Sequence, residues 1–433
     1  MLFLMILLIK LQLANPNTKT FTEGFIGTYQ ANDLPDPVLK LLSESLITID
    51  STGRPKPKLI EGWEVNSDAT IFKFKLKSNL KWADGSPILA KDLEFNIPDV
   101  EVTYLDDRTI QFKLNSSFSP FPTILNRPVF KKGTILLGTG PYKVLEIEKS
   151  RIFITKLNLE LINRQNLPNL IIRFYPNEKT VQTAFALGEI QAIYGLNEID
   201  NLPSYNKMKV EKKVSYSKIA AIFYNTQDKL LSSRSIRQAL SFQTPQIMGV
   251  TIADSLFPPN SWAFVKPQKD YLSNKEEANA ALERAKSNVP KELLQEEIVL
   301  TVTPTLENQG KEIVNAWKEL GLKVSLRVES GIPQNFQALL IVQNIPADPD
   351  QYSLWHSTQE KTNISKYNSK RADKDLEDGR KALNEEERKE KYADLQKVIL
   401  EDAPATFLYF PTLNVIFLEK TKPMVDKILP LQI

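Results

Sequence analysis

The stretch Leu41–Asn96 decides the fold, and it reads LLSESLITIDSTGRPKPKLIEGWEVNSDATIFKFKLKSNLKWADGSPILAKDLEFN. Near its middle, Phe72, Phe74 and Leu76 alternate with lysines, which is the two-residue period of a strand with one face in water. Ser51–Gly53 supplies a turn before this strand. The stretch therefore predicts a loop and a half-buried strand, followed by a short helical start, within one small region of the fold.

Three phrases within this stretch carry a resemblance to a known family. They are L-x-E-x-L-x-x-x-D at Leu42–Asp50, E-G-W-E-V at Glu61–Val65 and L-K-W-A-D-G-S-P-x-x-A-K-D-L-x-F at Leu80–Phe95. The chain resembles the family 5 extracellular solute-binding proteins of ABC transporters, the oligopeptide-, dipeptide- and nickel-binding group. The resemblance implies an α/β fold, a two-lobed periplasmic-binding-protein-like clamshell of type II, which holds its ligand between the lobes.

Length and composition are those of an ordinary soluble protein with more than one domain. A chain of 433 residues exceeds what one hydrophobic core usually serves, so two domains are expected. The net charge is +3, from 55 basic and 52 acidic residues with interleaved signs, which argues against nucleic acid as a partner. The absence of cysteine excludes disulfides, thiolate metal sites and cysteine nucleophiles. No metal site and no cofactor are predicted.

Composition and the resemblance together predict the domain boundaries. The apolar start of the chain is too short to span a bilayer, which takes about 20 apolar residues. We interpret residues 1–14 as the remnant of a signal peptide or membrane anchor, with a buried N-terminal strand as the alternative. Lobe I is predicted at 15–220 with a C-terminal return at 411–433, and lobe II at 221–410. The family's helical excursion after Phe95 is missing, which predicts a reduced accessory domain.

The first strand expected in lobe I, Phe21–Tyr29, contains two glycines. Glycine weakens a strand unless something must approach its backbone. The resemblance implies that this strand lies beside the ligand and bonds its main chain, which gives Gly27, Thr28, Tyr29 and Gln30 as ligand-binding candidates. A bulge or a tight bend explains the glycines equally well.

In lobe II, the strand and loop of Ala338–Ser357 carry the main candidates. In the family resembled, this strand borders the pocket and a nearby Asp pairs with the ligand's amino group. That position falls here at Asn344 or Ile345, and an amide cannot supply a full negative charge. For Asp348 and Asp350, hydrogen bonding within the loop and helix capping are the alternative. The ligand-binding candidates in lobe II are Asn225, Gln343, Asn344, Asp348, Trp355 and Asn363.

Catalysis is not predicted, because the usual catalytic constellations are missing. His356 is the only histidine, and the chain has no G-x-S-x-G phrase. Asp348 and Asp350 are separated only by Pro349, so they do not face each other across a cleft as glycosidase carboxylates do.

These features predict an extracytoplasmic substrate-binding component of an ABC transporter. It is expected to capture short peptides without reading their side chains, because backbone groups can bind an extended chain. The predicted partners are a small peptide and an ABC permease in the membrane. The protein is expected to be a monomer in the periplasm or on the outer face of the cytoplasmic membrane. The alternatives are a sensory or structural solute-binding protein without transport, and a binder of a nickel chelate or an oligosaccharide.

Overall fold

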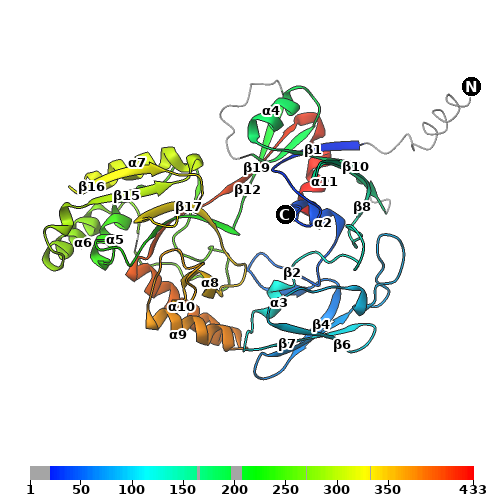
Figure 1. Cartoon of the computed structure of the whole chain (residues 1–433), viewed down its shortest axis with the longest axis horizontal. Coiled ribbons are helices and arrows are strands. Elements are labelled where there is room, and N and C mark those ends of the chain that lie inside the picture. Colours follow the sequence, from blue (N-terminus) through cyan, green and yellow to red (C-terminus); the bar gives the residue numbers. More distant parts are fainter. Residues whose placement is uncertain (1–19, 163–165, 197–206, 270, 332) are drawn as a thin grey trace, which may run out of the picture.

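The computed structural model describes residues 20–162, 166–196, 207–269, 271–331 and 333–433. The described strands form sheets of seven, six, four and two strands, with helices packed against the two larger sheets (Figure 1). The predicted signal peptide or anchor at 1–14 lies outside the described residues. None of the helices in the described ranges is long and apolar enough to cross a bilayer.

The seven-stranded sheet, here called the large sheet, combines strands from both ends of the chain in the order β12-β19-β11-β1-β10-β9-β8. Its strands are β1 (Thr20–Ile26), β8 (Tyr142–Ser150), β9 (Phe153–Leu161), β10 (Asn169–Tyr175), β11 (Ala192–Leu196), β12 (Met208–Val214) and β19 (Thr412–Leu418). β1 lies between β10 and β11 and is parallel to both. Helix α4 packs on one face, while α2 and α11 cover the other. The helices are α2 (Asp36–Leu42), α4 (Glu178–Ala186), η4 (Glu419–Thr421) and α11 (Lys422–Gln432).

The four-stranded sheet, here called the small sheet, contains much of the stretch that decides the fold and has the order β4-β5-β7-β6. Its region comprises β2 (Ile47–Ile49), β3 (Pro55–Pro57), β4 (Ile60–Val65), β5 (Ile71–Leu76), η1 (Ala90–Asp92), β6 (Val100–Tyr104), β7 (Thr109–Leu114) and α3 (Phe121–Ile124). The predicted alternation is confirmed, because Phe72, Phe74 and Leu76 are buried and the lysines between them are exposed. They belong to an apolar core whose buried members all lie between Leu46 and Leu125. The small sheet is therefore a domain with its own core, the reduced accessory domain.

The six-stranded sheet has helices on both faces and the order β14-β18-β13-β17-β15-β16. Helices α5, α6 and α7 share one apolar core with it, and α8, α9 and α10 share another on the opposite face (Figure 1). The strands are β13 (Lys218–Tyr224), β14 (Thr251–Ile252), β15 (Glu297–Val302), β16 (Lys323–Val328), β17 (Ala338–Asn344) and β18 (Ala405–Phe410). The helices are α5 (Arg234–Gln243), α6 (Lys275–Asn288), η2 (Leu293–Gln295), η3 (Pro304–Leu306), α7 (Glu307–Lys318), α8 (Tyr352–Trp355), α9 (Lys370–Lys381) and α10 (Glu385–Asp402).

Two short segments carry the chain between the large and the six-stranded sheets. The first is 215–217, between β12 and β13, and the second is Pro411, between β18 and β19. The two segments are bonded to each other, because Ser215 N donates to Pro411 O over 2.8 Å. We call 215–217 and Pro411 the hinge. The fold is thus two-lobed and α/β, with one lobe around each of the two larger sheets.

Candidate functional site

The strand registers place the C-terminal end of β1 at the side of the large sheet where strand ends meet the hinge, here called the hinge edge. β19 begins at Thr412, directly after the hinge, and Leu196 at the end of β11 pairs with Asn414 near that beginning. β1 runs parallel to β11, so β1 also ends at this edge. Adjacent strands lie about 4.8 Å apart, which puts the end of β1 roughly 10 Å from β19. The predicted segment Gly27–Gln30 follows β1 at this edge.

The end of β17 lies at the hinge edge of the six-stranded sheet in the same way. β17 is antiparallel to β13, and Asn344 pairs with Lys218, the first residue after the hinge. Ile345 N donates to Ser217 O over 2.9 Å, which ties this strand end to the hinge itself. Gln343 and Asn344 therefore lie beside the hinge in lobe II, and Asn344 is exposed.

Asn225 lies at the opposite edge of the six-stranded sheet, which corrects its grouping with Asn344. β13 is seven residues long, and Tyr224 pairs with Ala338 at the start of β17. Asn225 N donates to Gln337 O over 2.7 Å, and its side-chain amide donates to Phe336 O over 3.1 Å. At about 3.4 Å per residue, Asn225 is roughly 20 Å from the hinge edge. It holds a loop together far from Asn344.

The segment Gly27–Gln30 bends directly after β1 and stays bonded to the large sheet, because Ile154 N of β9 donates to Tyr29 O over 2.8 Å. Gly27 has φ +129°, and its N–H donates to Tyr175 O over 2.7 Å. The Tyr29 hydroxyl donates to Ile26 O over 2.8 Å, and burial together with Asp33 raises the pKa of this phenol. Thr28 is exposed between them. The bend that was the alternative explanation is thus present at Gly27, and contact of this segment with a ligand stays a prediction.

Asp348 is buried and bonded inside lobe II. Its Oδ1 lies 2.5 Å from Arg388 Nη2 and accepts the N–H of Asp350 over 2.9 Å. Burial alone would lower the pKa of Arg388, but Asp348 and Tyr392 raise it above its ordinary value. Burial raises the pKa of Asp350, against the opposing effect of Arg380 at 3.2 Å. Both carboxylates are therefore used in contacts within lobe II, which was the alternative to contact with a ligand.

Trp355 also lies in the core of lobe II. Its ring packs against Phe223 and Phe407, and its Nε1–H donates to Gln351 Oε1 over 2.7 Å. The side chain is 2% exposed, so its indole surface is occupied by the protein itself.

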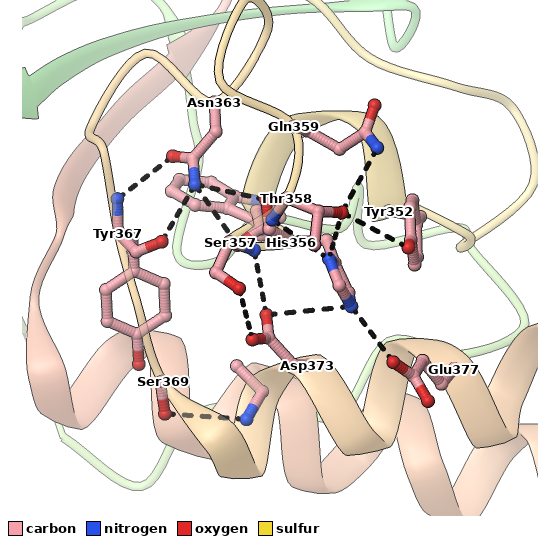
Figure 2. A network of polar contacts seen from close by, with 12 residues as sticks. Tyr352, His356, Ser357, Thr358, Gln359, Asn363, Tyr367, Ser369, Asp373 and Glu377 are labelled. Atoms are coloured by element: carbon pink, nitrogen blue, oxygen red, sulfur yellow. Dashed lines mark hydrogen bonds and ion pairs between the residues drawn. The ribbon is translucent and has the colours of Figure 1, made fainter.

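Asn363 and His356 belong to a polar network that orders the segment after α8, as Figure 2 shows. The Asn363 amide donates to Tyr367 O over 2.8 Å and accepts from Tyr367 N over 3.1 Å. His356 Nδ1 lies 2.8 Å from Thr358 Oγ1, and its Nε2 lies 3.3 Å from Glu377 Oε1. Both side chains are buried and satisfied, so this network is structural.

Two features near the hinge and the loop after β17 were missed by sequence reasoning. Lys218 lies directly opposite Asn344, and opposed residues of an antiparallel pair share one face of the sheet. The turn Ser51–Arg54, between β2 and β3 of the two-stranded sheet, approaches Ala347, in the loop that follows β17. No motif in the sequence distinguishes Lys218 from the other lysines, and Ser51–Gly53 was predicted to be a turn without any contact to lobe II. The pairing of Lys218 with Asn344 and the approach of the turn to Ala347 cannot be predicted without the tertiary structure.

Among the described residues, no three His, Cys, Asp or Glu side chains converge in a way that could hold a metal ion.

Comparisons with known proteins agree with this architecture. Residues 54–101 and 96–366 match the sequence profile described as bacterial extracellular solute-binding proteins, family 5 Middle. The dipeptide-binding protein of Escherichia coli K12 is 23% identical, over 92% of this chain and 87% of its own.

Two solved structures share the fold. NikZ from Campylobacter jejuni, in complex with Ni(L-His), has a TM-score of 0.73 at 20% identity, over 92% of this chain and 94% of that one. AppA from Bacillus subtilis, in complex with a nonapeptide, has a TM-score of 0.69 at 19% identity, over 93% and 95% of the two chains. Because the family profile covers well over half of the sequence, the chain belongs to the family 5 bacterial extracellular solute-binding proteins.

Proposed function

We propose that this protein is the substrate-binding component of an ABC transporter, that it holds short peptides between its lobes, and that it delivers them to a membrane permease. Proteins of this family bind solutes and are not enzymes. The observation that carries the proposal is the common position of Gly27–Gln30 and Gln343–Asn344, each beside the hinge at the edge of its own sheet.

Closure about the hinge is the proposed mechanism. Lobe I comprises the large and small sheets, lobe II comprises the six-stranded sheet, and 215–217 and Pro411 take up the backbone rotation. A ligand that contacts both lobes at once stabilises the closed form by the free energy of those contacts. The permease then recognises the closed form.

The backbone at the end of β1 and at the end of β17 suits an extended peptide. Gly27 N, Tyr29 O and Gln30 N are bonded within lobe I, so the groups proposed to bind a peptide main chain are the remaining ones around Thr28 and along Gln343–Asn344. Relatives support a peptide ligand, since the E. coli protein is named for dipeptides and AppA was solved with a nonapeptide. NikZ, solved with Ni(L-His), supports the nickel-chelate alternative.

We propose that this site does not require a free amino terminus on the peptide. Asn344 carries no charge, and the exposed Lys218 directly opposite it adds a positive charge. A peptide ammonium placed there would meet a cation instead of a carboxylate. Neutral or anionic ligand groups fit this end of the site better.

The test is calorimetric titration of the full chain with a mixed tetrapeptide library, with the same library N-acetylated, and with Ni(L-His). Both peptide libraries are expected to bind, with less than about a tenfold difference in Kd. The variant Asn344→Asp is expected to favour the free amino terminus. Asn308→Asp, at an exposed position of α7, is the control and should change nothing. Binding of Ni(L-His) alone would overturn the peptide assignment.

A further inference from the structure

The region of the small sheet contacts lobe II through the turn Ser51–Arg54, which joins β2 and β3 of the two-stranded sheet. In this turn, Arg54 forms a two-pronged ion pair with Glu385 at the start of α10, with Nε–Oε2 at 2.8 Å and Nη2–Oε1 at 2.6 Å. Trp262 N donates to Thr52 O over 3.0 Å, and the Asn260 amide donates to Ser51 O. These contacts join residues that are more than 200 positions apart in the chain.

A second set of contacts lies beside the first. Ser119 N donates to Arg380 O over 2.8 Å, and the Arg380 guanidinium lies 4.8 Å from the centre of the Phe118 ring. The other side of Arg380 belongs to lobe II, where the guanidinium lies over Tyr352 and pairs with Asp350. We call the two sets together the polar seam.

Gly53 sets how closely the turn and lobe II can approach. A Cβ atom on Gly53 would lie 2.5 Å from Ala347 O, which is closer than any real Cβ contact. The residue also has φ +90°, a conformation that other residues adopt only with strain. Ala347 belongs to the loop that follows Gln343 and Asn344. The turn therefore sits on the loop next to the proposed ligand site.

The polar seam has the character of a contact that opens. No described residue of lobe II joins the buried core of the small sheet, and none of the small sheet joins the cores of lobe II. Arg54 and Glu385 are 36% and 44% exposed. Asn260 Oδ1, Ser119 Oγ and Arg380 Nε are buried at the seam without a hydrogen-bond partner among the described residues, and opening would return them to water. Small polar interfaces between domains permit relative motion.

We propose that the polar seam is a reversible latch, formed only when the lobes are closed, and that Gly53 is the residue that lets the latch engage. The inference rests on the proposed function, because closure traps a ligand between the hinge on one side and the latch on the other. Residues Ser51–Arg54 then stabilise the closed form by contacting lobe II, without contacting the ligand.

The experiment measures the distance between the small sheet and lobe II by double electron–electron resonance. The chain has no cysteine, so Lys91→Cys and Lys291→Cys, both at exposed positions, give one spin-label pair without background. Without ligand, the parent pair is expected to populate both a short distance, the latched form, and a longer distance, the open form. Gly53→Ala should reduce the latched-to-open ratio by more than about tenfold. Gly85→Ala is the matched control, because Gly85 has φ +84° and nothing within 4 Å of a Cβ, so it carries the strain without the contact.

A charge reversal tests the latch without a backbone change. Arg54→Glu should lower the latched population about two- to fivefold, and Arg54→Glu with Glu385→Arg should restore it. Equal distance distributions for Gly53→Ala and Gly85→Ala, or failure of the double reversal to restore the short distance, would overturn the latch. Addition of the tetrapeptide library tests the proposed function separately. If the library leaves the parent distribution unchanged while the variants shift it, peptide capture fails and the latch stands.

Discussion

The small sheet meets its two neighbours through two different kinds of interface, and the difference indicates which parts move together. The chain leaves the large sheet after α2 and returns to it before β8, and these two crossings are bonded to each other: Gly140 N donates to Leu42 O over 2.9 Å, and Glu44 N donates to Thr139 Oγ1 over 2.9 Å. A Cβ on Gly140 would lie 2.6 Å from Leu41 O. We call this backbone-to-backbone packing of 138–140 against 41–44 the glycine seam.

The glycine seam lies where the chain itself crosses twice to the large sheet. The polar seam also has main-chain hydrogen bonds, but no chain crossing joins the small-sheet region to lobe II there, and part of it is the exposed Arg54–Glu385 pair. Two chain crossings that are bonded side by side keep the small-sheet region next to the large sheet, and the close approach at Gly140 leaves no room for a side chain between them. An exposed ion pair contributes at most about 1 kcal/mol and can be replaced by water. The small sheet is therefore expected to travel with the large sheet and to separate from lobe II.

The largest effect is expected from filling the glycine seam. Gly140→Val places side-chain atoms where Leu41 and Leu42 backbone atoms already lie, so it should cost more than about 4 kcal/mol of unfolding free energy or prevent folding. The measurement is urea unfolding followed by circular dichroism. Gly62→Val is the control, since nothing lies within 4 Å of a Cβ on Gly62. If Gly62→Val lost as much unfolding free energy as Gly140→Val, the close packing at Gly140 would not be what stabilises the glycine seam.

The next effect concerns the buried pair that supports the lobe II side of the polar seam. Asp348→Ala leaves Arg388 buried without its carboxylate and should cost about 3–5 kcal/mol by thermal unfolding. The exposed Asp68→Ala serves as the control. If Asp348→Ala instead kept the parent melting temperature and lost peptide binding, Asp348 would be a ligand contact, as the sequence first suggested.

A pH dependence above about pH 6 should separate the block that contains the large sheet from lobe II, where burial raises the pKa of Asp375 only to about 6. Burial raises the pKa of Glu23 from 4.5 to about 7, against the hydrogen bond from Gln432 Nε2 at 2.6 Å. Between these two values the unfolded chain has lost a proton that the folded chain keeps. Stability of the large sheet should therefore fall by roughly 3 kcal/mol as the pH rises through this window, and stay level above it.

Glu23→Gln should abolish this pH slope in calorimetric unfolding scans between pH 4.5 and 8. If the small sheet is joined to the large sheet as the glycine seam indicates, its unfolding should follow the same slope. A slope confined to the unfolding of lobe II would contradict the assignment to Glu23.

The smallest effect is expected at the polar seam itself. Arg54→Ala removes one exposed ion pair, so the free energy of unfolding should change by less than about 1 kcal/mol. Added salt at about 0.5 M should shrink even that difference, because exposed charges are screened. A loss as large as that of Gly140→Val would show that the two seams are equally rigid.

Much of the fold was predictable because its signals are local. The alternation of Phe72, Phe74 and Leu76 predicted β5, and the family phrases predicted two lobes and a reduced accessory domain. The site was less predictable. Gly27–Gln30 and Gln343–Asn344 lie at the hinge edges, but Asn225 lies at the far edge, because it follows the end of β13 and the hinge precedes the beginning of that seven-residue strand.

The sequence by itself determined the family, the α/β class and the positions of most strands and helices, since motif spacing and periodicity are properties of neighbouring residues. The tertiary structure alone decided that Asp348 belongs to Arg388, that Lys218 faces Asn344, and that the Ser51–Arg54 turn touches lobe II. Each of these pairs is separated by 40 or more residues. Strand order and register bring such residues together, and neither follows from any local stretch of the chain.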